Sequence, residues 1–348
     1  MTVTTTFMKL FLKLGFFDLM RSASPNTLTV LNYHRIDDPT RPGFNTFKPN
    51  VSATPAQFEE QMDYLSQKYN PVSGRDIAEW LHGGRKLPPN AALVTFDDGY
   101  YDNLQHAYPV LKARNIPAII FLTTNHIDSS VPFYWDFVAY CFDNTTGDDA
   151  DFPLFGSRHW YDAGSRNGVM VEWMTWAKTL PETEKQKQVD CLPEVLNVSV
   201  PDDLSAGLTL TWSDVRHLSA NGIEMGSHTL NHPILTRIGL DEAKKELELS
   251  KKQIEAETNL PVVSFAYPNG HRPDFNQDVV ECVRQTGYQV AFTLLSGLSS
   301  YKVVRESPLT IRRIFIGYRD SFPRFVGKLM GVSRFNPKSD AFLPLGRG

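Results

Sequence analysis

Two adjacent carboxylates, Asp97 and Asp98, directly follow an apolar run, Leu93 to Phe96, that predicts a buried strand. Carboxylates brought together repel each other, so the pKa of one rises unless a cation neutralises the pair. Gly99 comes next, and a glycine permits the sharp turn that would direct both carboxylates into one cleft. The pair therefore predicts a bound metal ion, whose other ligands should lie elsewhere in the chain.

Two histidines are the other candidate ligands. His228 and His232 are four residues apart, so they can meet on one face if this segment forms one turn of helix. Neutral imidazole is the commonest metal ligand in proteins. Two imidazoles with the carboxylate of Asp98 leave coordination positions open for water and substrate, as catalytic zinc requires. Asp97, beside the metal but not bound to it, could then take a proton from water.

Three motifs make the chain similar to the polysaccharide deacetylases, the NodB-homology domain of carbohydrate esterase family four. They occur in the family's order, and the resemblance extends roughly from Leu28 to Ile316. It implies an α/β fold, namely a distorted (β/α) barrel with an inserted, mainly helical or loop segment. The motifs are Thr95-Phe96-Asp97-Asp98-Gly99, Ser227-His228-Thr229-Leu230-Asn231-His232 and, as a variant of the third, Phe265-Ala266-Tyr267-Pro268-Asn269-Gly270.

The resemblance also implies roles for these residues. Asp98, His228 and His232 would hold one divalent metal ion, zinc in the first place, with cobalt or nickel as alternatives. Asp97 would act as the general base. The backbone N–H of Asn269 would stabilise the oxyanion that forms during amide hydrolysis.

The general acid and the residue that orients Asp97 depart from the family pattern. Many relatives carry the acid in a late Leu-His motif, but this chain has no histidine after His271. His34, at the end of the first predicted strand, is our hypothesis for the acid; the alternative is a structural histidine at a strand end. The usual arginine of the third motif is replaced, so Arg312 or Arg313 is expected to hold the base bidentately, with Arg312 as the candidate. The pair Tyr33-His34 and the altered third motif resemble the subgroup that acts on poly-N-acetylglucosamine-type polymers.

Four aromatic residues are candidate substrate contacts. Tyr134 and Trp135 open the predicted insertion, and amphipathic aromatic rings exposed at a cleft can stack on sugar faces. The alternative is that these two rings fix the insertion to the barrel. Tyr100 and Tyr267, which stand in or beside the first and third motifs, are further candidates.

The composition is that of an ordinary globular protein of 348 residues with a net charge of −4. That charge argues against a nucleic-acid partner, which would require a basic excess. The three cysteines show no CxxC spacing, and an odd count fits a reducing compartment. The chain contains no P-loop and no GxSxG nucleophile elbow, which argues against nucleotide enzymes and serine esterases.

Alternating strand and helix patterns indicate an α/β domain. We expect an N-terminal amphipathic segment at 1–27, the deacetylase domain at 28–322 with an insertion at about 126–208, and a peripheral tail at 323–348. No signal peptide is evident, so a cytoplasmic location is expected. Residues 7–21 could form an amphipathic helix on a membrane surface, with Lys9, Lys13 and Arg21 near the headgroups; the alternative is a helix packed on the domain.

The expected reaction is hydrolysis of the N-acetyl group of amino sugars in a polysaccharide or its lipid-linked precursor, with release of acetate. Such an enzyme would serve exopolysaccharide biosynthesis. One alternative is a deformylase or other amide hydrolase of the same fold, and another is a sugar-binding module that has lost catalysis. The presence of Asp97 beside a complete ligand set speaks against the binding module, because binding alone needs no base.

Overall fold

The computed structural model describes residue 11 and residues 14–331. The chain divides into two compact units, each of which is described by itself. Within the described residues, the first unit comprises those up to 39, 49–128 and those from 207 onward, and the second comprises 40–48 and 129–206.

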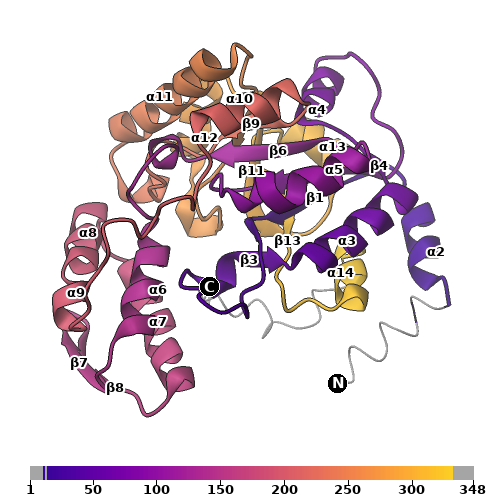
Figure 1. Cartoon of the computed structure of the whole chain (residues 1–348). Helices are drawn as coiled ribbons and strands as arrows, with labels where there is room; N and C mark the ends of the chain where they lie inside the picture. The colour runs from indigo at the N-terminus through magenta and orange to yellow at the C-terminus, as the bar shows by residue number, and fades with distance from the viewer. Residues whose placement is uncertain (1–10, 12–13, 332–348) are drawn as a thin grey trace. The chain divides into compact units, whose positions relative to one another are not determined.

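A closed barrel of seven parallel strands forms the centre of the first unit (Figure 1). Around the ring the order is β1, β5, β6, β9, β10, β11 and β13, and β13 pairs with β1 again. This closure confirms the expected (β/α) barrel. The strands are β1 (Thr27–Tyr33), β5 (Ala91–Phe96), β6 (Ala118–Leu122), β9 (Glu224–Ser227), β10 (Ser264–Ala266), β11 (Val290–Ser296) and β13 (Ile311–Phe315).

Short strands add to the barrel at its margins. β4 (Asn70–Pro71) pairs in parallel with β5, and β12 (Ser299–Ser300) pairs antiparallel with β1. β2 (Arg35–Ile36) and β3 (Val51–Ala53) form a separate parallel pair directly after β1. The chain therefore remains ordered beyond the end of β1, where His34 stands.

Helices of the first unit connect the strands. Three of them begin with a capping box, in which Thr54, Ser73 and Thr211 each accept a hydrogen bond from a backbone N–H three residues later. The α-helices are α2 (Phe16–Ala23), α3 (Pro55–Lys68), α4 (Gly74–Leu81), α5 (Tyr108–Ala113), α10 (Trp212–Ala220), α11 (Leu240–Thr258), α12 (Gln277–Gln285), α13 (Tyr301–Glu306) and α14 (Phe322–Leu329). Shorter turns are η1 (Lys48–Asn50), the π-helical η2 (Asn103–Ala107), η3 (Thr124–His126), η4 (Leu235–Arg237) and η5 (Arg272–Asp274).

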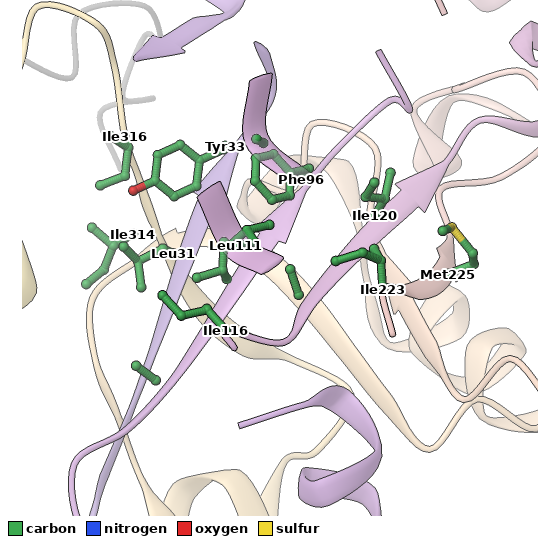
Figure 2. Close-up of a cluster of buried hydrophobic side chains, with 14 of the residues drawn as sticks. Leu31, Tyr33, Phe96, Leu111, Ile116, Ile120, Ile223, Met225, Ile314 and Ile316 are labelled. Atoms are coloured by element: carbon green, nitrogen blue, oxygen red, sulfur yellow. The ribbon is translucent and has the colours of Figure 1, made fainter. Parts of the chain in front are cut away.

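The largest apolar cluster lies between barrel strands and helices of the first unit. Figure 2 shows Leu31 of β1, Phe96 of β5 and Ile120 of β6 beside Leu111 of α5, all of them buried. Every residue of β5 is buried, as expected for a parallel sheet covered on both sides. This packing fixes the strand ends that carry the candidate site.

The second unit is helical with one hairpin. The strands β7 (Asp149–Phe152) and β8 (Gly156–His159) pair antiparallel. Buried aromatic rings, including Trp173 and Phe142, supply its interior. Its helices are α6 (Tyr134–Asn144), α7 (Ala163–Ala177), α8 (Glu182–Asp190) and α9 (Leu192–Val195).

The two ends of the described chain both pack on the first unit. In α2, Phe17 is buried in the main cluster and Asp18 pairs with Lys68 of α3, while Leu19 is 69% exposed. Lys9 and Lys13, named for membrane contact, lie outside the described residues. Among residue 11 and residues 14–331, no helix is long and apolar enough to cross a membrane.

The expectation that the chain becomes peripheral at residue 323 is wrong. Phe325, Val326 and Leu329 of α14 are buried in the main cluster, because this helix presents an apolar face to the barrel unit. Residues 332–348 of the predicted tail lie outside the described part.

Candidate active site

The proposed metal ligands converge at the C-terminal ends of β5 and β9. The Oδ1 atom of Asp98 lies 3.7 Å from Nε2 of His228 and 3.7 Å from Nε2 of His232. The two imidazole centroids are 4.8 Å apart, and one ligand atom from each of the three residues lies within 4.8 Å of the others. All three side chains are buried. Parallel barrels gather their functional groups at these strand ends.

The two histidines meet through a loop rather than through the helical turn that their spacing suggested. Thr229 and His232 have φ values of 71° and 60°, which lie in the left-handed region and are costly for a β-branched residue. The hydroxyl of Thr229 accepts a hydrogen bond from the backbone N–H of His232 at 3.0 Å. Asp98 also has a positive φ, 75°, so the turn after β5 begins one residue before the predicted Gly99.

The tautomer and charge of His228 suit a metal ligand. Its Nδ1 lies 2.7 Å from the carbonyl oxygen of Ala266, so Nδ1–H donates there and Nε2 keeps its lone pair for the side facing Asp98. Burial, aided by Arg313, lowers the pKa of His228, and this outweighs the opposing effects of Asp97 and the Ala266 carbonyl. The imidazole is therefore held in the neutral form that binds metals.

Asp97 is held by groups from two neighbouring strands. Arg313 of β13 donates from Nη1 to Oδ1 at 2.7 Å and from Nη2 to Oδ2 at 2.8 Å. Asn32 of β1 donates from Nδ2 to Oδ2 at 2.8 Å. Burial raises the pKa of Asp97, but Arg313 in the first place, with His228 and His34, outweighs burial and brings that pKa to about 2. The carboxylate is consequently ionised and fixed in orientation.

Arg313, not Arg312, makes the predicted arginine contact. Arg312 instead donates from Nη1 to the carbonyl oxygen of Ser296 at 3.3 Å, in an exposed position. The choice of Arg312 is wrong because successive side chains of a strand point to opposite faces, and Arg313 is the one on the interior face. Its guanidinium also donates from Nε to the carbonyl oxygen of Thr293 at 3.1 Å.

Sequence reasoning missed Asn32 as a site residue. Its side chain is buried within the apolar strand β1. An amide in such a strand must be hydrogen-bonded, and that exception to the apolar pattern was the available signal.

His34 lies directly after β1, and its ring is 5.8 Å from that of Phe315, edge-on. Its backbone is fixed on both sides, because His34 N–H donates to Ser52 Oγ at 2.9 Å and Asn103 Nδ2 donates to the His34 carbonyl oxygen at 2.8 Å. The side chain is half-buried, and its protonated form would contribute to lowering the pKa of Asp97. It therefore lies near enough to the carboxylate to interact electrostatically with it.

Asn269 follows β10 in a tight turn. Its φ is 59° and its side chain is half-buried. Gly270 has a φ of 66°, and a Cβ atom there would lie 2.7 Å from the backbone nitrogen of Leu294. Only glycine allows this close approach, which fixes the backbone of the turn beside β11.

The aromatic candidates are less accessible than expected. Tyr100 and Tyr267 are fully buried; the Tyr267 hydroxyl donates to the carbonyl oxygen of Leu309 at 3.0 Å, and Arg35 lies 5.0 Å from the Tyr100 ring centroid. Neither ring therefore has an exposed face on which a sugar could stack in this structure. A role of Tyr100 and Tyr267 in substrate binding stays a prediction.

Trp135 and Tyr134 belong to the second unit. Trp135 is 6% exposed and stacks on Phe133 with centroids 4.6 Å apart. Tyr134 is half-buried, with the Lys185 ammonium 4.5 Å from its ring centroid. These contacts with Phe133 and Lys185 lie within the second unit.

The donor set fits a divalent metal ion. Two imidazoles and one carboxylate from the described residues offer nitrogen and oxygen donors within 4.8 Å of one another, the combination found in three-ligand catalytic zinc sites. The bond between His228 and the Ala266 carbonyl is the outer-shell contact that orients a ligating imidazole.

Comparison with known proteins places the chain in a family. The polysaccharide deacetylase family matches residues 84–291. The poly-beta-1,6-N-acetyl-D-glucosamine N-deacetylase of Escherichia coli K12 is 23% identical over 315 residues, which are 90% of this chain and 40% of that protein. A Staphylococcus epidermidis protein of the same name is 31% identical over 113 residues, 30% of this chain and 39% of that one.

Two solved structures share the fold. The deacetylase PplD of Streptococcus pyogenes, in complex with acetate, superposes with a TM-score of 0.58 at 17% identity, covering 88% of this chain and 99% of that one. IcaB of Ammonifex degensii superposes with a TM-score of 0.56 at 20% identity, covering 88% and 98%. With its barrel, its ordered motifs and this match over more than half of its length, the chain belongs to the polysaccharide deacetylase family.

Proposed function

We propose that this protein is a metal-dependent N-deacetylase, which hydrolyses the N-acetyl group of amino sugars in a poly-N-acetylglucosamine-type polysaccharide or its lipid-linked precursor. One observation carries the proposal. A fixed, ionised carboxylate, Asp97, stands directly beside the convergent group of Asp98, His228 and His232. Binding of a sugar would need neither the base nor the ligand set.

Asp98, His228 and His232 would hold the metal ion, for which zinc suits the mixed nitrogen and oxygen donors, with cobalt or nickel as alternatives. When bound, a divalent ion supplies polarisation of the acetamide carbonyl and a lowered pKa for water. The neutral state of His228 is the form required for this role.

The chain's own groups would then move the protons. Asp97 accepts a proton from the attacking water, and Arg313 and Asn32 keep its carboxylate oriented during that transfer. The backbone N–H of Asn269 is the proposed donor to the oxyanion. His34 is the proposed acid that protonates the sugar nitrogen as the C–N bond breaks, so that acetate and a free amine leave.

The nature of the substrate rests on the relatives. The Escherichia coli and Staphylococcus epidermidis proteins are named for poly-beta-1,6-N-acetyl-D-glucosamine, but this chain spans about 40% of the length of the former. A polymer of N-acetylglucosamine is therefore the first substrate to test. Within the same fold, a formamido sugar is the alternative, since the same groups would hydrolyse a smaller amide.

The test is release of acetate from N-acetylglucosamine oligomers by zinc-loaded protein, with formate measured in parallel on N-formylglucosamine. Asp97→Asn and His228→Ala serve as inactive controls. Acetate released by the parent and by neither variant supports the proposal. Formate release without acetate would favour the deformylase. Release of neither product by zinc-loaded parent protein would contradict both.

A further inference from the structure

Glu246 of α11 contacts the loop that joins the two histidine ligands. Its Oε2 atom accepts hydrogen bonds from the backbone N–H groups of Leu230 at 2.8 Å and Asn231 at 3.0 Å. Its Oε1 atom accepts from Nδ2 of Asn231 at 2.6 Å. The side chain is 6% exposed, whereas Glu248, two residues later, lies at the surface. These three hydrogen bonds compensate the burial of the Glu246 carboxylate, because an unpaired buried charge would be costly.

The opposite side of this loop is held by the segment after β6. Asn125 donates from its backbone N–H to the carbonyl oxygen of Leu230 at 2.9 Å, and its Nδ2 donates to Oδ1 of Asn231 at 2.7 Å. Thr124 N–H donates to the Thr229 carbonyl oxygen at 3.1 Å. Leu230 and Asn231 are therefore held from two sides, by Glu246 of α11 and by Asn125 after β6. We call these contacts the clamp.

The clamp acts on a strained backbone. Thr229 and His232, on either side of the clamped pair, both have positive φ, a conformation that persists only where the surrounding structure imposes it. Loss of the carboxylate would leave the backbone N–H groups of Leu230 and Asn231, both in part-buried hydrogen bonds, without their acceptor. The loop would then relax, and His232 would move relative to His228.

We propose that Glu246 is a positioning residue for the metal site, which sets the separation of the two imidazoles without contacting the ion. The inference deepens the proposed function and rests on its metal site. Replacement of outer-shell partners of metal ligands typically lowers affinity about 10–100-fold. We therefore expect zinc affinity, and not the fold, to respond first to a change at Glu246.

The experiment measures zinc affinity of the metal-free protein in competition with a chromogenic chelator. Glu246→Ala should weaken zinc binding about 10–100-fold. The zinc affinity of Glu246→Gln should be about 10-fold lower than that of the parent, at the low end of that range. The amide oxygen of the glutamine still accepts from a backbone N–H, but its NH2 group opposes Nδ2 of Asn231. Glu248→Ala, on the same helix with a carboxylate 49% exposed, is the matched control and should bind zinc as the parent does.

Amide hydrogen exchange of the metal-free protein separates positioning from a general structural role. The N–H groups of Leu230 and Asn231 should exchange faster in Glu246→Gln, while those of the barrel strands keep their parental protection. Parental zinc affinity in a folded Glu246→Ala protein overturns the proposal. If Glu246→Ala does not fold, parental affinity in Glu246→Gln overturns it. A parent protein that binds no zinc would instead contradict the proposed function itself.

Discussion

The guanidinium of Arg313 donates one hydrogen bond to each carboxylate oxygen of Asp97, at 2.7 and 2.8 Å. The two residues belong to β13 and to the end of β5, and β1 pairs with both strands. Asn32 of that intervening strand adds the third bond to the carboxylate. Three adjacent strands thus position one ionised group beside the candidate metal ligands.

Arg313→Lys should lower kcat/KM by at least about 10-fold, because a point charge cannot reproduce the bidentate contact that orients a base contributing about 10²–10⁴-fold. The measurement is steady-state deacetylation by zinc-loaded protein. Arg312→Lys, on the opposite face of the same strand, is the control and should keep parental kinetics. Equal losses in the two variants would contradict an orienting role for Arg313.

His34→Gln should reduce kcat by about 10²–10⁴-fold, the usual contribution of a positioned acid, and leave zinc affinity unchanged. The reason is that His34 would donate a proton to the leaving nitrogen without holding the metal. Steady-state kinetics measures kcat, and a zinc titration of the same preparation measures the zinc affinity. Parental kcat in this variant would exclude His34 as the acid.

The stability of the metal-free protein should depend on the ionisation of Asp97 in acid. Its pKa in the folded protein is about 2, below its ordinary value of 3.8. A depressed pKa contributes stability that is present above the unfolded pKa and is lost as pH falls through about 2. Denaturant unfolding should therefore show the parent losing about 2 kcal/mol relative to Asp97→Asn between pH 5 and pH 2. A constant difference across this range would contradict the assigned ion pair.

Trp135→Ala should destabilise the second unit by about 3–5 kcal/mol, the usual cost of truncating a buried aromatic side chain. KM should not change, because the ring stacks on Phe133 and is buried. Thermal unfolding and kinetics of the variant test this. Tyr161→Ala, at a position that is 85% exposed, is the control. A raised KM with parental stability would restore Trp135 as a sugar contact.

The barrel strands and the candidate ligands could be predicted from the sequence because their signals are local. An apolar run followed at once by Asp97 and Asp98 marks β5, and the motif that contains His228 begins at the end of β9. Parallel strands bring such ends together regardless of their separation along the chain. The backbone path between the ligands could not be predicted in this way, because the i,i+4 spacing of the histidines fits a helical turn as well as the observed loop.

Two roles in the site depend on contacts between distant parts of the chain, so the sequence did not assign them. Arg312 and Arg313 are adjacent in one strand, so composition could not choose between them; alternation from the buried Ile311 would have favoured Arg313. Glu246 falls in a run rich in Lys and Glu, a composition that is typical of a solvated helix face. It nevertheless lies on the buried stripe of α11 with Ala243 and Ser250, and a charge on such a stripe requires a partner.

The most direct test of the whole account is metal removal and restoration. The zinc-loaded protein should release acetate from N-acetylglucosamine oligomers, lose that activity on dialysis against a chelator, and regain it with one equivalent of zinc. Asp98→Asn should bind zinc weakly and stay inactive after the same addition, because it lacks the carboxylate between the two imidazoles. Acetate release that persists undiminished in chelator-treated, metal-free protein would contradict the account.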